Sequence, residues 1–250
     1  MLPVPPGSKR RRNALMMDDT EVRDVVWRNC AWSGCATLQS AMDAYPDLQV
    51  YLAGGVVRNA FLSCAIASKD FDLFFGGPSV EGALELWKLS GSMDFGPFGS
   101  ARWYPARKEK AYCDLIRIDR FVNGLWPCED MVDVLNQFDF TGNAVALDLR
   151  SGQFLDPQNG RRDLARRILR AVRFDYPDEA IVIGHPLTRN EVLWFRLIHY
   201  ATMLELKIEH VTLHWLRRNK GYHAKQSLFA EHFFEPHLEL AGLGICDERP

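Results

Sequence analysis

The hydrophobic positions in the first 160 residues follow two different spacings, so this part of the chain is predicted to mix strands and helices. Short apolar runs bounded by turn residues are typical of strands, and they occur at 48–53, 70–75, 111–118, 143–149 and 153–155. Apolar residues at helical spacing occur over about 19–44, over a short stretch from Gly55 to about Cys64, and over 80–89. A Gly/Ser/Pro-rich stretch over 91–100 is predicted to be a loop. We therefore expect a mixed β-sheet with helices packed against it.

After residue 160 the pattern becomes helical, which predicts a second part of different character. Apolar stripes predict helices over 161–173, 191–206, 208–219 and 222–236. The division that follows is a tail over 1–18, an α/β part over 19–160 and a helical part over 161–250. The tail carries the run Lys9-Arg10-Arg11-Arg12, which is either a solvated leader or an electrostatic contact to RNA phosphates.

Composition narrows the class of protein without naming a function. The chain is 47% hydrophobic and 25% charged, as in ordinary globular proteins, and its net charge of −2 gives no overall basic field. No apolar run reaches 18 residues, and the N-terminus lacks the apolar core of a signal peptide, so no membrane partner is expected. The six cysteines form no Cys-x-x-Cys pair. We expect free thiols and a cytoplasmic location.

The segment from Gly54 to Asp72 carries the most specific chemistry in the chain. Asp70 and Asp72 lie two apart in a predicted strand, so both carboxylates face the same side and suit a hard divalent cation such as Mg²⁺. Upstream, Gly54 and Gly55 allow a backbone to approach a phosphate closely, and Arg58 adds a guanidinium. These are the parts that phosphoryl or nucleotidyl transfer requires.

Other residues carry weaker signals, each with a structural alternative. A third metal-binding carboxylate is expected from Asp114 in the next strand, with Asp119 as its rival. The basic stretch 161–173 contains six arginines; it is either a solvated face or an RNA contact made by residues such as Arg162, Arg166 and Arg170. The pair Trp103-Tyr104 either stacks an unpaired base or packs in the core. His210 and His214 lie one helical turn apart, as zinc ligands or, as we expect, as surface residues.

The order of the motifs resembles the tRNA nucleotidyltransferase and bacterial poly(A) polymerase family of the class II, CCA-adding type. The resemblance runs from about residue 49 to residue 208. It rests on Leu52-Ala53-Gly54-Gly55-Val56-Val57-Arg58, Asp70-Phe71-Asp72, Asp139-Phe140-Thr141-Gly142-Asn143-Ala144, and then Gly160, Asp163-Leu164 and Ile168-Leu169-Arg170. It implies an α+β chain with a nucleotidyltransferase-fold head and a helical neck.

The resemblance also implies roles for individual residues. In that family, positions matching Gly54, Gly55 and Arg58 hold the incoming triphosphate, and positions matching Asp70 and Asp72 bind two Mg²⁺ ions, with Asp114 as third carboxylate. Asp139 and Asn143 would contact the nucleotide sugar, and Arg196 would read the base edge. The implied reaction transfers NMP from ATP or CTP to an RNA 3′-hydroxyl, as at a tRNA 3′ end, and releases pyrophosphate.

The chain departs from the family pattern in places that bear on its substrate. The differing positions are Asn59, Gln137, Phe138, Leu193, His199 and Tyr200, and the C-terminal part that grips tRNA is mostly missing. Two alternatives therefore stay open: transfer to a small-molecule or protein hydroxyl, and a non-catalytic protein that binds nucleotide or RNA. A homo-oligomer or a partner protein that supplies the missing part is also left open.

Overall fold

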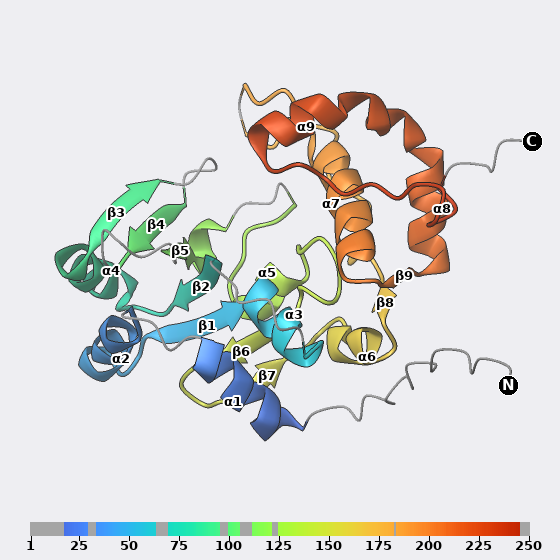
Figure 1. Cartoon of the computed structure of the whole chain (residues 1–250). Helices are drawn as coiled ribbons and strands as arrows, with labels where there is room; N and C mark the ends of the chain where they lie inside the picture. Colours follow the sequence, from blue (N-terminus) through green and yellow to red (C-terminus); the bar gives the residue numbers. More distant parts are fainter. Residues whose placement is uncertain are drawn as a thin grey trace, which may run out of the picture.

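The computed structural model describes residues 18–29, 34–63, 70–95, 100–105, 112–121, 125–182 and 184–245. Nearly all of the predicted basic tail therefore lies outside the described residues. The first part of the chain is built on one seven-stranded mixed sheet with the strand order β3-β4-β5-β2-β1-β6-β7 (Figure 1). The predicted mixed sheet with helices is confirmed.

The sheet combines one parallel strand pair with antiparallel neighbours. β2 and β5 run parallel, and the other pairs, β1–β2, β1–β6, β3–β4, β4–β5 and β6–β7, are antiparallel. The strands are β1 (Gln49–Ala53), β2 (Asp70–Gly76), β3 (Ser92–Phe95), β4 (Ala101–Tyr104), β5 (Tyr112–Arg117), β6 (Ala146–Asp148) and β7 (Phe154–Leu155). Since β1 and β2 are central, the motifs on them lie in the middle of the sheet.

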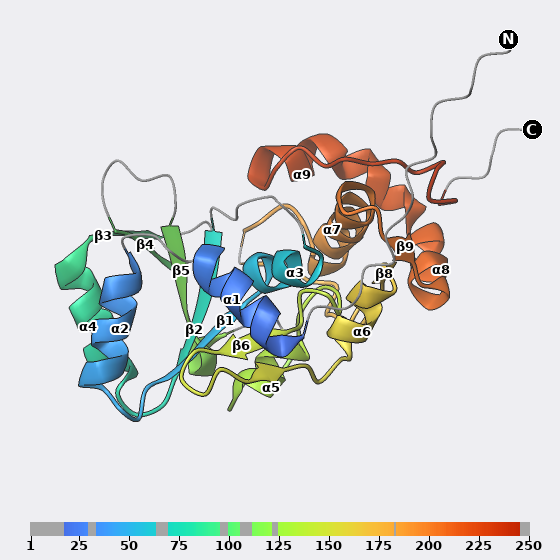
Figure 2. The same ribbon diagram turned by 60° about the horizontal axis from the view of Figure 1, so that its bottom comes forward.

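Four helices pack near the sheet: α1 (Asp19–Asn29), α2 (Gly34–Ala44), α3 (Gly55–Phe61) and α4 (Val80–Ser90) (Figure 2). The single helix predicted over 19–44 is wrong, because the structure has two helices there. The loop predicted over 91–100 is also wrong in part. It contains β3, whose four residues alternate between polar and apolar but are too few to stand out beside the glycines and proline that follow, and whose backbone pairs with β4.

The alternation of side chains along β2 determines where the two aspartates point. Phe71, Leu73 and Phe75 are buried in one hydrophobic core with residues of α1 to α4. Because successive side chains of a strand point to opposite faces, Asp70 and Asp72 lie on the other face. Phe74 on that face packs against the short helix α5 (Met131–Leu135). The apolar pattern of the strand therefore places the carboxylates on the face opposite to the core that α1 to α4 share.

The second part of the chain is helical and packs around a separate core. Its elements are α6 (Gly160–Ala165), β8 (Ile168–Leu169), α7 (Arg189–Met203), β9 (Lys207–Ile208), α8 (His210–Arg218), the 3-10 helix η2 (Lys220–Lys225) and α9 (Gln226–His232), while the 3-10 helix η1 (Ile118–Arg120) follows β5. Helices α7, α8 and α9 lie together on the side away from β3 and β4 (Figure 1). Trp194, Phe195 and Phe229 are fully buried in their core, and Phe233 and Phe234 pack against it.

The basic helix predicted over 161–173 is wrong beyond its first two turns. α6 ends at Ala165, and Arg167 adopts a left-handed conformation with φ of 55°. The next residues, Ile168–Leu169, pair with Lys207–Ile208 from the far end of α7. A contact with residues forty positions away therefore decides the local structure, although the apolar stripe alone favoured a helix.

In the described residues, no helix is both long and apolar enough to span a membrane. Cys113 and Cys128 are buried free cysteines.

Candidate active site

One row of residues across four strands forms the base of the candidate site. Asp72 of β2 lies opposite Ala53 of β1 on one side and opposite Asp114 of β5 on the other. Asp114 in turn lies opposite Arg102 of β4. Residues opposite one another on neighbouring strands point to the same face, so the predicted third carboxylate lies beside the aspartate pair.

Gly54 brings the backbone directly against the central carboxylate. It links β1 to α3 and has a φ of 71°, which favours glycine. A Cβ atom at Gly54 would lie only 2.6 Å from Oδ2 of Asp72. Glycine is therefore required here both by the backbone conformation and by the approach of the Asp72 side chain.

Arg58 is a buried cation held by neutral groups. It lies on α3 and is only 6% exposed. Its Nε and Nη2 donate to Oδ1 of Asn59 at 3.1 and 2.9 Å, and its Nη1 donates to Oδ1 of Asn143 at 2.6 Å. These three hydrogen bonds are made to neutral amide oxygens. Burial lowers the pKa of Arg58, while nearby Tyr200 and Asp139 raise it.

Asp139 links the α/β part to α7. Its carboxylate accepts hydrogen bonds from Nδ2 of Asn143 at 3.0 Å and from Nε of Arg196 at 2.8 Å. Cζ of Arg196 lies 5.3 Å from the centre of the Tyr200 ring, and Cζ of Arg58 lies 4.8 Å from the centre of the same ring. These five residues form a closed set of contacts, which we call the two-arginine ring: Arg58, Asn143, Asp139, Arg196 and Tyr200.

The carboxylates of the strand row repel one another. Burial together with the charges of Asp114 and Asp70 raises the pKa of Asp72 from 3.8 to about 7, although Arg196 and Arg58 pull it back. Asp114 has a partner of its own, since its Oδ1 accepts a hydrogen bond from Nε of Arg102 at 3.0 Å. Asp72 is therefore the carboxylate whose negative charge is least compensated.

The donor set of this site fits a hard divalent cation through two carboxylates. Asp70 and Asp72 offer oxygen ligands, and the negative charges of Asp114 and Asp70, which together with burial raise the pKa of Asp72, favour a cation there. Among the described residues, however, no three His, Cys, Asp or Glu side chains are arranged to hold a metal ion together. Mg²⁺ commonly uses one or two carboxylates plus substrate phosphates and water, and this arrangement is compatible with that mode.

Arg170 supports the site rather than facing outward. It pairs with the buried Asp163 at 2.9 Å, and Thr141 donates to the same carboxylate oxygen at 2.9 Å. These contacts join α6 to the turn that contains Asp139 and Asn143. Of the three arginines expected to contact RNA, Arg162 and Arg166 are exposed, whereas Arg170 is partly buried in this network.

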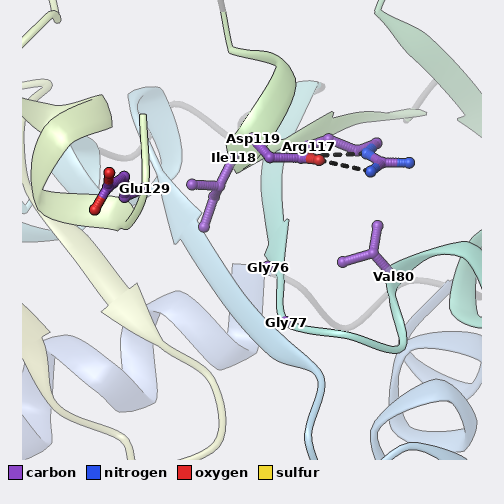
Figure 3. A pocket seen from close by; sticks show the side chains of 7 residues that line it. All are labelled: Gly76, Gly77, Val80, Arg117, Ile118, Asp119 and Glu129. Carbon is purple, nitrogen blue, oxygen red and sulfur yellow. Dashed lines mark hydrogen bonds and ion pairs between the residues drawn. The ribbon is translucent and has the colours of Figure 1, made fainter. Parts of the chain in front are cut away.

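Asp119, the rival third carboxylate, lies at the opposite end of the parallel strand pair. There it accepts hydrogen bonds from Arg117 at 2.9 and 2.7 Å, next to a small cavity that Gly76, Gly77 and Glu129 help to line (Figure 3). Because β2 and β5 run parallel, Asp114 is level with Asp72 while Asp119 is beyond the last paired residue, Arg117. The geometry favours Asp114.

For the tryptophan and the histidine with weaker sequence signals, the structure supports the structural interpretation. Trp103 is fully buried and donates through Nε1 to the carbonyl of Trp87 at 2.9 Å, so it packs in the core. His210 is 90% exposed and pairs with Glu209, as expected of a surface residue. Two site residues escaped the sequence reasoning, Arg102 and Tyr200. Tyr200 was noted only as a departure from the family pattern, and that departure was the one available signal.

The amino-acid sequence is similar to those of curated proteins of known type. A multifunctional CCA protein of Haemophilus ducreyi is 32% identical over 138 residues, which cover 54% of this chain and 32% of that protein. The corresponding protein of Hahella chejuensis is 35% identical over 133 residues, covering 50% and 29%. Over about half of its length, the chain is similar to multifunctional CCA proteins. It spans about a third of the length of these curated relatives. No protein-family model matches it.

Solved structures confirm the predicted nucleotidyltransferase fold of the CCA-adding enzymes. A CCA-adding enzyme in complex with CTP matches with a TM-score of 0.64 and 20% identity, over 90% of this chain and 55% of that one. A tRNA nucleotidyltransferase complexed with a primer tRNA and an incoming ATP analog matches with a TM-score of 0.54 and 23% identity, over 76% and 52%. The family resemblance seen in the motifs is thereby confirmed at the level of sequence and fold.

Proposed function

We propose that this chain is a metal-dependent nucleotidyltransferase that transfers NMP from ATP or CTP to an RNA 3′-hydroxyl and releases pyrophosphate, in the manner of CCA-adding enzymes and poly(A) polymerases. The observation that carries the proposal is the position of Asp72, which lies beside Asp114, against the Gly54 backbone and within the electrostatic influence of Arg58 and Arg196. Carboxylates for metal and guanidiniums for phosphate thus meet at one place.

In this proposal Arg58 binds the triphosphate. Its guanidinium is already positioned by Asn59 and Asn143, whose amide oxygens orient it without neutralising its charge. A preorganised cation in a buried site attracts an anion more strongly than the same group in water. Asp139 and Asn143 would contact the sugar, and Arg196, fixed by Asp139, would read the base edge.

Asp70 and Asp72 would hold Mg²⁺, and we propose two ions, as in related two-metal reactions. Bound magnesium would supply activation of the attacking hydroxyl and stabilisation of the charge on the departing pyrophosphate. Asp114 would complete the carboxylate set, with Arg102 fixing its orientation. Asp72 would have to be ionised to act as a ligand, so its raised pKa limits metal binding at acid pH.

The acceptor is proposed to be RNA, with a tRNA 3′ end as the first candidate, and the compartment the cytoplasm. Support comes from related proteins: one neighbour in fold was solved with a primer tRNA and another with CTP. On this chain, Arg162 and Arg166 are exposed and available for RNA phosphates. The division into a head over 19–160 and a neck over 161–250 stays part of this proposal.

Incubation with Mg²⁺, each labelled nucleoside triphosphate and total RNA tests the proposal on a denaturing gel. We expect label in an RNA band, lost in Asp70→Asn and Asp72→Asn. Asp119→Asn is the matched control, because it makes the same change at the other end of the strand pair; it should retain transfer. If pyrophosphate is released only when a small-molecule or protein acceptor is added, that acceptor and not RNA is the substrate. Nucleotide binding without any pyrophosphate release would instead indicate a non-catalytic protein.

A further inference from the structure

Tyr200 contacts both arginines of the two-arginine ring. It lies on α7 one helical turn after Arg196, and its ring centre is 4.8 Å from Cζ of Arg58 and 5.3 Å from Cζ of Arg196. Both distances are within the range, about 6 Å, at which a cation is attracted to an aromatic face. The ring of Phe140, 5.3 Å away, supports Tyr200 within the molecule.

The two arginines need such a neighbour because they repel each other. Arg196 lowers the pKa of Arg58, as expected of two like charges brought close together in a partly buried site. Arg196 has Asp139 as a counter-charge, but Arg58 is held by amide oxygens. Tyr200 offsets part of this repulsion: its hydroxyl raises the pKa of Arg58 by electrostatic interaction and a hydrogen bond, and its electron-rich face lies within cation–π distance of both guanidiniums.

Tyr200 also joins two parts of the chain that are far apart in sequence. Arg58 belongs to α3, at the end of the first strand, whereas Arg196 and Tyr200 belong to α7. The other connection between the two arginines runs through Asn143 and Asp139. Without the aromatic side chain of Tyr200, the two guanidiniums would therefore be connected only through the hydrogen bonds of Asn143 and Asp139.

We propose that Tyr200 is a positioning residue for nucleotide binding, which holds Arg58 and Arg196 in one fixed relation and thereby couples the contact to the triphosphate with the contact to the base. This inference rests on the proposed function, in which the two arginines bind these two parts of one nucleotide. The residue acts through the arginines and takes no part in the transfer itself.

The test compares Tyr200→Leu, which removes the ring, with Tyr200→Phe, which keeps it. Tyr222→Leu is the matched control, because Tyr222 is a partly buried tyrosine of the same helical core. Equilibrium binding of CTP and of ATP is measured with Mg²⁺ and without acceptor, after circular dichroism has shown that each variant is folded. We expect Tyr200→Leu to weaken the tighter-bound nucleotide about tenfold, which equals about 1.4 kcal/mol. Tyr200→Phe should lose threefold or less, and the control should match the wild type.

A double-mutant cycle separates coupling from a merely structural role. Arg58→Lys and Arg196→Lys are measured singly and together, in the presence of Tyr200 and in the Tyr200→Leu background. With Tyr200 present, the combined loss of nucleotide affinity should differ from the product of the single losses by at least threefold; without the ring, the losses should multiply. If the leucine variant does not fold, the cycle is run in Tyr200→Met, which also removes the aromatic face but fills more of its space.

The outcomes distinguish this inference from the proposed function. Wild-type affinity in Tyr200→Leu, or an unchanged coupling between Arg58 and Arg196, would overturn the role of Tyr200 even if RNA is extended normally. Nucleotide binding that depends on Tyr200, in a protein that transfers no nucleotide, would support the inference while the proposed reaction fails. Absence of nucleotide binding in the wild type would overturn both.

Discussion

Replacement of Asp72 by asparagine should stabilise the metal-free protein while abolishing the proposed activity. The pKa of Asp72 is raised from 3.8 to about 7 by burial and by the charges of Asp114 and Asp70. Ionised Asp72 therefore destabilises the fold, and this interval corresponds to about 4 kcal/mol as an upper limit. Asparagine keeps the shape of the side chain without the charge. We expect Asp72→Asn to gain roughly 2 kcal/mol or more in unfolding free energy at pH 8.

The pH dependence of this gain gives the sharper test. Between pH 3.8 and about 7 the folded wild type holds a proton on Asp72 that the unfolded chain has lost. Proton linkage then makes its stability fall as the pH rises, by up to about 1.4 kcal/mol per pH unit from this group. The advantage of Asp72→Asn should therefore be small near pH 4, grow toward pH 7 and level off above it.

Urea unfolding in the presence of EDTA, at pH 4, 5, 6, 7 and 8, measures this difference between wild type and variant. Magnesium should then stabilise the wild type at pH 8 and leave Asp72→Asn nearly unchanged, because only the wild type offers both carboxylate ligands. Asp119→Asn should behave oppositely, since its hydrogen bond from Arg117 lowers the pKa of Asp119 and makes its charge favourable. A variant at Asp72 that is no more stable than wild type at pH 8 would refute the electrostatic reasoning.

Three further predictions concern single residues. Gly54→Ala should destabilise the fold by about 2 kcal/mol and abolish transfer, because of the positive φ and the 2.6 Å approach of a carboxylate oxygen, as measured by urea unfolding and gel assay. Arg170→Ala should cost about 2 kcal/mol by leaving buried Asp163 without its cation, whereas exposed Arg166→Ala should leave stability unchanged and weaken RNA binding alone in a filter-binding assay. Thr188→Ala removes the capping box of α7. It should reduce the free energy of unfolding by about 1 kcal/mol, seen as a lower melting temperature, without changing the nucleotide Kd.

Local patterns were sufficient for the parts of the site that lie on single strands. The alternation through Phe71, Leu73 and Phe75 predicted which face Asp70 and Asp72 share, and the structure packs those three apolar residues into one core. The match of β2 with β5 could be anticipated for the same reason, because Asp114 lies in an equally apolar strand.

Contacts between distant residues explain what the sequence did not predict. The helix expected over 161–173 ends early because β8 pairs with β9, and β3, whose own pattern extends over only four residues, pairs with β4. Tyr200 acquires its position only when α7 packs beside α3, more than 140 residues away in the chain. No local spacing carries that information, so a substitution within a family motif was the only hint.

The charges of the site make its metal-free and nucleotide-free state electrostatically unfavourable, and they indicate which charge pattern a ligand should have. Asp72 is a buried carboxylate beside the charges of Asp114 and Asp70, and Arg58 is a buried positive charge held by amide oxygens. Both are costly by themselves, because burial penalises each charged group, and neither can relieve the other fully, since Arg58 lowers the pKa of Asp72 only in part. A ligand that brings a cation to the first group and an anion to the second compensates both at once. A magnesium–triphosphate complex has this charge arrangement, whereas magnesium alone or a free phosphate would relieve one side only. The affinity for the complex should consequently exceed what its two parts show when each is titrated separately against the same protein.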